Sequence, residues 1–161
     1  SVESIGKYAF DTCSNLTSVT IENGVKSIRE YAFQSCGSLR EIILPNSVTD
    51  LGYSAFAECN GLTSVTLSSG MKTIEDSAFY SCDQLTKITI SSDVTYIGGS
   101  AFSGCYQLTE ITLPDTISNI GSAAFSSCYK LMPIRSRTLR ITLKHILSGM
   151  GILLPLHNSL Q

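Results

Sequence analysis

The sequence predicts a repeat solenoid, in which short coils of equal length stack on one another through parallel strands. Three observations support this fold class. The six Phe residues and the six Cys residues of the chain each recur at intervals of 23 residues. No insertion or deletion interrupts this period between about residues 5 and 134. A unit of 23 residues cannot bury its many apolar residues alone, whereas stacked units bury them against one another.

The first element of each unit is predicted to be a β-strand, as residues 16–22 illustrate. In this segment Val19 and Ile21 alternate with polar neighbours. A period of two residues with many β-branched side chains is typical of a strand that has one buried face. A residue suited to a turn follows the strand in successive units: Gly24, Ser47, Gly70, Asp93 and Thr116.

The remainder of each unit is predicted to contain a second extended stretch and a closing turn. Val25 and Ile28 mark the second stretch, which is short and faces inward. The unit closes with the pattern A-F-x-x-C, and the first copy of this pattern in the chain runs from Ala9 to Cys13. Inward positions at i, i+1 and i+4 predict one turn of α-helix or 3₁₀-helix here. We expect Phe to fill the middle of the coil, and Ala to stand where the backbone approaches closely.

The repeated residues also indicate a family. Their pattern, L-x-x-I-x-L-P-x-x-[IV]-x-x-I-G-x-x-A-F-x-x-C, resembles the BspA-like subclass of leucine-rich repeats. The segments Leu108–Pro114 and Ile120–Cys128 match it almost letter for letter. The prediction is therefore a right-handed leucine-rich-repeat β-solenoid. Each coil has one main parallel strand, a second short extended segment and a helical or 3₁₀ turn. The resemblance covers about residues 1–134, roughly five and a half repeats.

The resemblance implies a function as well as a fold. Proteins of this family are typically secreted or cell-surface proteins of bacteria and of some parasitic protists, and members are implicated in adhesion to host proteins and other cells. The chain is thus expected to be a non-enzymatic protein-interaction module at a cell surface or outside the cell. Its expected partner is a protein, such as a host or extracellular-matrix protein. The alternative is a structural or self-associating array element without a specific ligand.

The candidate binding residues are the outward-facing side chains of the main strand, which stack into three columns on the concave strand face. Leucine-rich-repeat proteins commonly bind ligands with this face. The alternative explanation is that Thr-rich columns simply suit exposed strands. The residues concerned are Ser18, Thr20, Glu22, Glu41, Ile43, Ser64, Thr66, Ser68, Lys87, Thr89, Ser91, Glu110 and Thr112.

Composition argues against several other functions. The net charge of −2 does not suit a general nucleic-acid binder. No run of 18 apolar residues is present, so no transmembrane helix is expected. The two His residues, His145 and His157, lie in the last 17 positions, so the repeats contain no His to activate a nucleophile. The adjacent carboxylates Glu75 and Asp76 are expected to point apart into water. No cofactor is expected.

The six Cys residues raise the question of disulfides, which secreted proteins often contain. Cys residues in stacked coils would have Cα atoms about 4.8 Å apart. Their parallel Cα–Cβ bonds, however, would hold the Cβ atoms too far apart for a relaxed disulfide. We therefore expect a ladder of free, buried thiols. With one Cys in each coil and no nearby His, no metal site is expected.

The end of the chain does not follow the repeat. After Ile134 the next Phe would be due at position 148, which is Ser148. Residues 135–161 carry four basic and no acidic residues, whereas residues 1–134 carry a net charge of −6. This tail could be a C-terminal cap, a membrane-associating segment or a poorly ordered, non-native extension. Array ends without a cap would allow self-association. The chain begins inside a repeat without signal-peptide features, which suggests a processed chain or a fragment.

Overall fold

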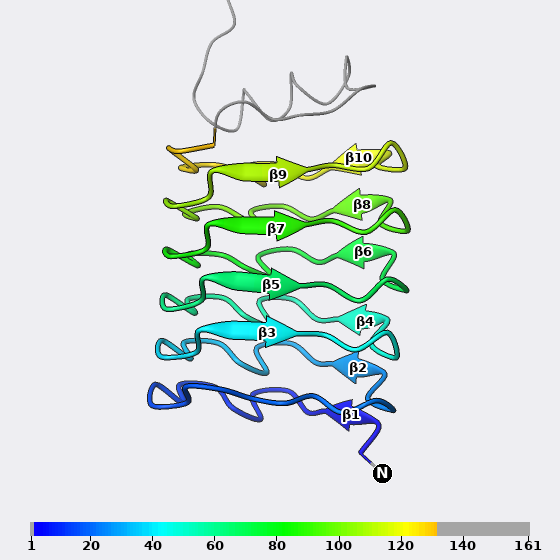
Figure 1. Cartoon of the computed structure of the whole chain (residues 1–161), viewed down its shortest axis with the longest axis vertical. Helices are drawn as coiled ribbons and strands as arrows, with labels where there is room; N and C mark the ends of the chain where they lie inside the picture. The colour runs from blue at the N-terminus through cyan, green and yellow to red at the C-terminus, as the bar shows by residue number, and fades with distance from the viewer. Residues whose placement is uncertain (1, 132–161) are drawn as a thin grey trace, which may run out of the picture.

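A computed structural model describes residues 2–131, which form a stack of coils with two sets of parallel strands (Figure 1). The described residues contain ten short strands and no helix. The predicted tail, residues 135–161, lies outside the described residues. The cap, the membrane-associating segment and the non-native extension therefore stay predictions. The larger sheet consists of four strands in the order β3 (Glu41–Ile43), β5 (Ser64–Thr66), β7 (Lys87–Thr89) and β9 (Glu110–Thr112).

The other six strands have two residues each and form two shorter ladders. One ladder contains β1 (Ser4–Ile5), β2 (Ser27–Ile28) and β4 (Asp50–Leu51), and the other contains β6 (Thr73–Ile74), β8 (Tyr96–Ile97) and β10 (Asn119–Ile120). Every paired residue meets the residue 23 positions later, as Val65 meets Ile88. This register confirms the predicted solenoid and its two extended segments. The two ladders are separate because β4 and β6 do not pair.

The first coil departs from the prediction. Residues 16–22 do not form a strand, and within residues 2–131 no backbone hydrogen bond joins them to β3. The A-F-x-x-C segment of this coil is hydrogen-bonded to the next coil, because the Phe10 amide donates to the Ala32 carbonyl over 2.8 Å. The Phe10 and Phe33 rings also stack, with centroids 5.0 Å apart. Within residues 2–131 this segment has a neighbouring strand on one side only, so pairing would give it half the ladder bonds of an inner strand.

The A-F-x-x-C segment is not the predicted helical turn. In the fourth coil, the amides of Ala78 and Tyr80 donate to carbonyls three residues earlier, over 3.2 and 3.0 Å. The alternate amides of Phe79 and Ser81 instead donate to carbonyls of the next coil, over 2.9 and 2.8 Å. In a 3₁₀-helix every amide would bond locally. Ser77 and Ser81 have φ angles of 55° and 50°, so the segment consists of successive tight turns with left-handed residues.

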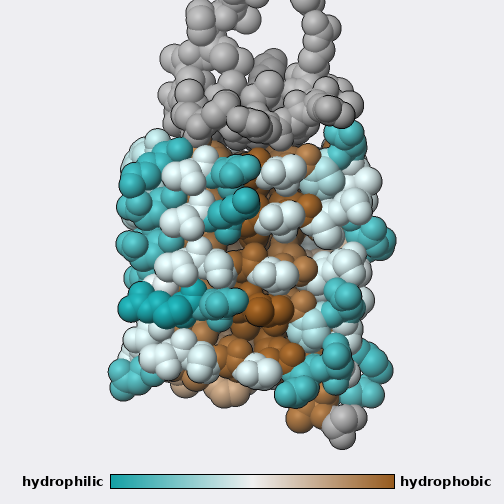
Figure 2. Space-filling view, viewed as in Figure 1, coloured by the Kyte–Doolittle hydropathy of each residue, from teal (hydrophilic) through white to brown (hydrophobic). Residues whose placement is uncertain are grey.

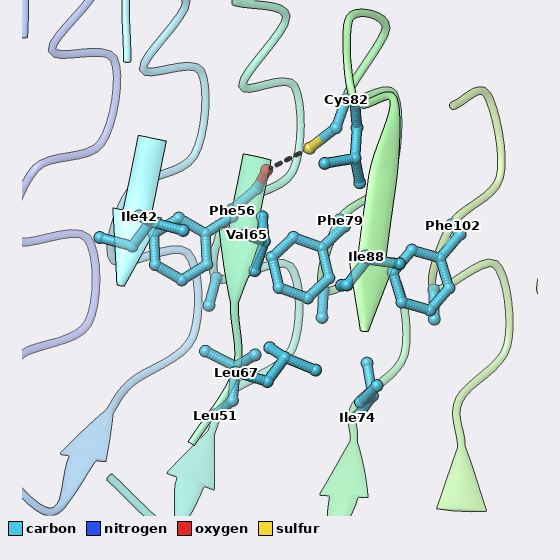
Figure 3. Close-up of a cluster of buried hydrophobic side chains, with 14 of the residues drawn as sticks. Ile42, Leu51, Phe56, Val65, Leu67, Ile74, Phe79, Cys82, Ile88 and Phe102 are labelled. Carbon is cyan, nitrogen blue, oxygen red and sulfur yellow. Dashed lines mark hydrogen bonds between the residues drawn. The ribbon is translucent and has the colours of Figure 1, made fainter. Parts of the chain in front are cut away.

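A stack of parallel Phe rings forms the centre of the core (Figure 3). The Phe79 ring lies between those of Phe56 and Phe102, at centroid distances of 5.7 and 5.6 Å. All three rings are fully buried. Columns of Ile, Leu and Val surround them, as Figure 3 shows. Burial of one Phe contributes about 1.5–3 kcal/mol relative to exposure, and this contact recurs between successive coils.

The Cys residues form a second column beside the Phe rings. All six are free, as predicted. Each buried thiol donates a hydrogen bond across to an earlier coil; Cys82 Sγ, for example, lies 3.2 Å from the Phe56 carbonyl oxygen (Figure 3). Cys13 is exposed, contrary to the prediction, because within residues 2–131 no coil packs on the outer side of the first coil.

Candidate functional site

The candidate binding surface is the main-strand face, which we define as the outward side of β3, β5, β7 and β9 together with residues 18–22 of the first coil. In each of the four strands the middle residue is buried and its two neighbours are exposed. Figure 2 looks onto this face, where hydrophobic surface runs along the middle between more polar flanks. The alternation follows from the period-two pattern of the sequence.

The strand register places eight predicted residues in two exposed columns. The ion pair between Lys87 and Glu110 lies within the first column, with a distance of 3.8 Å between Nζ and Oε2. Both side chains are more than half exposed, so the pair adds little stability. Ser18 and Thr20 are exposed in the first coil, below β3. The first column is Glu41, Ser64, Lys87 and Glu110, and the second is Ile43, Thr66, Thr89 and Thr112.

The third predicted column is not a continuous exposed surface. Glu22 is exposed, but Ser68 is fully buried and Ser91 is half-buried. Ser68 Oγ accepts a hydrogen bond from the Gly70 amide over 3.2 Å, so this hydroxyl stabilises the turn after β5. Ser91 Oγ is buried and has no hydrogen-bond partner among the described residues. Ser68 is therefore not available to a partner, because the chain turns inward just after the strand.

A groove opens in the main-strand face where the first coil fails to pair with β3. Its volume is about 420 Å³, and it is lined by residues 18–21 together with Glu41, Ile43 and Pro45. Ile43 is 56 % exposed although it is apolar. The sequence analysis assigned Val19 and Ile21 to the buried side of a strand, so it did not include them among the binding residues. The one signal was Ile43 itself, which stands where the other coils have Thr.

The acidic pair Glu75 and Asp76 does not form a catalytic dyad. Glu75 Oε1 accepts a hydrogen bond from Thr73 Oγ1 over 2.9 Å, and Asp76 Oδ1 accepts one from the Gly99 amide over 2.6 Å. Within residues 2–131 no group of three or more His, Cys, Asp and Glu residues could hold a metal ion. This part of the chain also has no helix with the length and apolar character of a membrane span.

Tyrosines gather beside the A-F-x-x-C turns, away from the main-strand face. The rings of Tyr8 and Tyr31 stack with centroids 4.9 Å apart, and Lys7 Nζ lies 5.2 Å from the Tyr8 centroid. Tyr53 meets Tyr31 edge-on at 5.2 Å. Desolvation and, to a lesser degree, Tyr53 and Tyr8 raise the pKa of Tyr31. A second stacked pair, Tyr106 and Tyr129, lies at 5.7 Å.

Comparisons with known proteins agree with this architecture. The family model described as BspA type leucine rich repeat region matches residues 3–132 in six copies. A leucine rich cell surface protein from Faecalibacterium prausnitzii has a similar solved structure, with 36 % sequence identity and a TM-score of 0.73. The match covers 78 % of this chain and 33 % of that one. For a leucine-rich repeat protein of T. pallidum the identity is 35 % and the TM-score 0.68, over 70 % of this chain and 52 % of that one.

A third similar structure, a leucine-rich repeat protein from Eubacterium ventriosum, has 24 % identity and shows the fold alone. Its TM-score is 0.73, and the match covers 86 % of this chain and 43 % of that one. Among curated protein sequences, none matches the chain. The chain spans about a third and about half of the length of the first two solved structures.

Proposed function

The chain belongs to the BspA-type leucine-rich repeat family, and from this premise we propose that it binds a protein partner through the main-strand face. Leucine-rich repeat proteins are generally protein-interaction modules. In this proposal the chain is a non-enzymatic adhesion module that is secreted or displayed at a cell surface. The similar protein from F. prausnitzii is described as a cell surface protein, which supports the proposed location.

The groove beside Ile43 is the observation that carries the proposal. Interfaces are anchored by a few apolar side chains that fill pockets, while polar groups at the rim exclude water. The groove of about 420 Å³ is large enough for such a side chain, and Ile43 supplies apolar surface at its edge. The columns headed by Glu41 and Ile43 continue from the groove along four strands, so they supply polar contacts for a rim.

Surface plasmon resonance with a panel of purified extracellular-matrix proteins tests the proposal. The Ile43→Arg variant places a charge at the edge of the groove without touching the buried core. We expect it to weaken binding of the recognised matrix protein at least about tenfold, as loss of an interface anchor does. Tyr80→Arg is the matched control, because Tyr80 is 40 % exposed and lies in an A-F-x-x-C turn.

Two results would contradict the proposal. If no matrix protein binds the wild-type chain, the adhesive role is wrong. If Tyr80→Arg abolishes binding while Ile43→Arg leaves the dissociation constant unchanged, the binding surface lies elsewhere on the solenoid.

A further inference from the structure

A column of glycines controls how closely the coils approach on the second-strand face, which we define as the side that carries the two-residue strands. A Cβ atom at Gly52 would lie 2.5 Å from the backbone nitrogen of Glu30 in the coil before. A Cβ atom at Gly98 would likewise collide with the backbone of Asp76. Close pairing therefore favours glycine at this position. Along the stack the column contains Gly6, Arg29, Gly52, Glu75, Gly98 and Gly121.

The strand ladder is interrupted at Glu75, where the column carries a side chain in mid-stack. The Gly98 amide donates to the Ile74 carbonyl over 2.7 Å, and the Arg29 amide makes a longer bond of 3.0 Å to Ile5. For Glu75 the structure of residues 2–131 has no such bond to Leu51, and β4 and β6 do not pair. The missing bond coincides with a Cβ atom in the glycine column, although Arg29, which also carries one, keeps its longer bond.

The separation leaves a groove of about 350 Å³ that is rich in hydrogen-bond acceptors. Its lining residues include the acidic residues Glu30, Asp50 and Glu75, and Arg29 is the one basic residue among them. None of the three carboxylates takes part in an ion pair within the described residues. We call this space the acidic groove.

Two further features make the acidic groove more than a set of surface carboxylates. Tyr53, which is 43 % exposed, is one of its lining residues. Leu51 is also a lining residue, and its carbonyl accepts no backbone hydrogen bond from β6. Beyond the groove, burial and, to a lesser degree, the charges of Asp76 and Glu75 raise the pKa of Tyr96.

We propose that the acidic groove binds an arginine side chain presented by an extended, basic segment of a partner protein. A guanidinium group is planar, stacks on aromatic rings and donates five hydrogen bonds. Tyr53 provides the ring, Asp50 and Glu75 provide carboxylates for charge-assisted bonds, and the Leu51 carbonyl provides a further acceptor. This site is separate from the main-strand face, so it does not depend on the function proposed for that face.

Fluorescence anisotropy with a labelled hexa-arginine peptide at low salt tests the assignment. The Asp50→Asn/Glu75→Gln variant removes two charges but keeps the Cβ atom that opens the groove. We expect about tenfold weaker binding, and binding to the wild type that weakens as salt screens the charges. Asp11→Asn/Glu58→Gln removes the same net charge elsewhere, from two A-F-x-x-C turns, and is expected to leave the dissociation constant within about twofold.

A second variant, Glu75→Gly, tests the geometry independently of the charge at Asp50. Glycine should allow β4 and β6 to pair, which closes the groove and slows hydrogen exchange of the residue 75 amide. We expect this variant to bind the peptide more weakly than Glu75→Gln does. The proposal is overturned if the two double variants bind equally, since the peptide would then sense only net charge. It is also overturned if the wild type does not bind or if Glu75→Gly binds as tightly as Glu75→Gln.

Discussion

At the residue scale, the Cys column stabilises the stack by satisfying buried carbonyl groups as well as by filling space. The Phe56 carbonyl accepts the Cys59 amide over 3.4 Å and the Cys82 thiol over 3.2 Å. A carbonyl oxygen has two lone pairs, so both bonds can form at once. The sequence predicts small, buried, free thiols at these positions. It does not predict the bonds, because the donor and acceptor lie 26 residues apart in different coils.

Buried thiols make the stability of the chain depend on alkaline pH. Burial raises the pKa of the Cys128 thiol to about 12, and it also raises the pKa values of Cys82 and Cys105. In the unfolded chain a thiol has a pKa of about 8.5. Below that pH both states are protonated, so the thiols add no pH dependence. Above it the unfolded chain loses protons that the folded chain keeps, so the free energy of unfolding falls as pH rises toward the folded pKa values.

Urea denaturation between pH 7 and 11 measures this effect. We expect constant stability up to about pH 8 and a decline above it, by at most about 1.4 kcal/mol per pH unit for each buried thiol. Cys82→Ala should reduce the slope, whereas Cys13→Ala should not, because Cys13 is exposed. Tyrosine ionisation contributes equally to all three proteins, so the difference in slope isolates the thiol. Equal slopes for wild type and Cys82→Ala would contradict the expectation.

At the scale of single elements, glycine at one position of the coil allows the closest approach in the second-strand ladder, as at Gly98, where an added Cβ atom would collide with Asp76. Gly98→Glu places a glutamate side chain in the fifth coil at the position that Glu75 holds in the fourth. We expect loss of the pairing between β6 and β8, faster hydrogen exchange of the residue 98 amide, and a loss of about 1–3 kcal/mol in the free energy of unfolding.

Gly37→Glu is the control for this substitution, because a Cβ atom at Gly37 would have no other atom within 4 Å. Its stability should stay within about 0.5 kcal/mol of the wild type. If Gly98→Glu unfolds at the same urea concentration as Gly37→Glu, the close approach of the backbone does not control pairing.

The elements also show how far the sequence predicts this fold. The 23-residue period predicts which residues pair, and the register of Val65 with Ile88 bears this out. It does not predict how the amides of one turn divide between local and inter-coil acceptors. Inward spacing of i, i+1 and i+4 fits a helical turn as well as successive tight turns. The left-handed residues of those turns include Tyr31 and Glu58, which give no compositional signal of positive φ.

The sequence likewise predicts only part of the candidate site. The alternation of each strand predicts the exposed columns that contain Glu41 and Ile43, because side chains two residues apart share a face. Ser68 lies two residues beyond the strand, where alternation no longer applies, and it is buried. Alternation does not predict the groove below β3, since residues 16–22 carry the same pattern as coils that do pair, and Ile43 is the one residue that marks this place.

At the scale of the whole molecule, the chain behaves as a one-dimensional array, in which each coil contacts only its neighbours. The contacts are nearly the same at each interface: Phe centroids are 5.0–5.7 Å apart, and each buried thiol reaches a Phe carbonyl over 3.0–3.3 Å. An array of this kind should tolerate the loss of one whole period, because the remaining ladders stay in register.

Deletion of residues 87–109 removes one period and joins Thr86 to Glu110, which has the same place in the repeat as Lys87. The Phe79 ring would then stack on Phe125, and the Cys128 thiol would reach the Phe79 carbonyl, as Cys105 now does over 3.3 Å. We expect a cooperative urea transition at a lower midpoint, because one coil and one interface are lost. Deletion of residues 87–97 shifts the pattern by about half a period and places polar residues in the core, so we expect no cooperative transition by circular dichroism. If the whole-period deletion also unfolds without cooperativity, the coils are not interchangeable and the one-dimensional description is wrong.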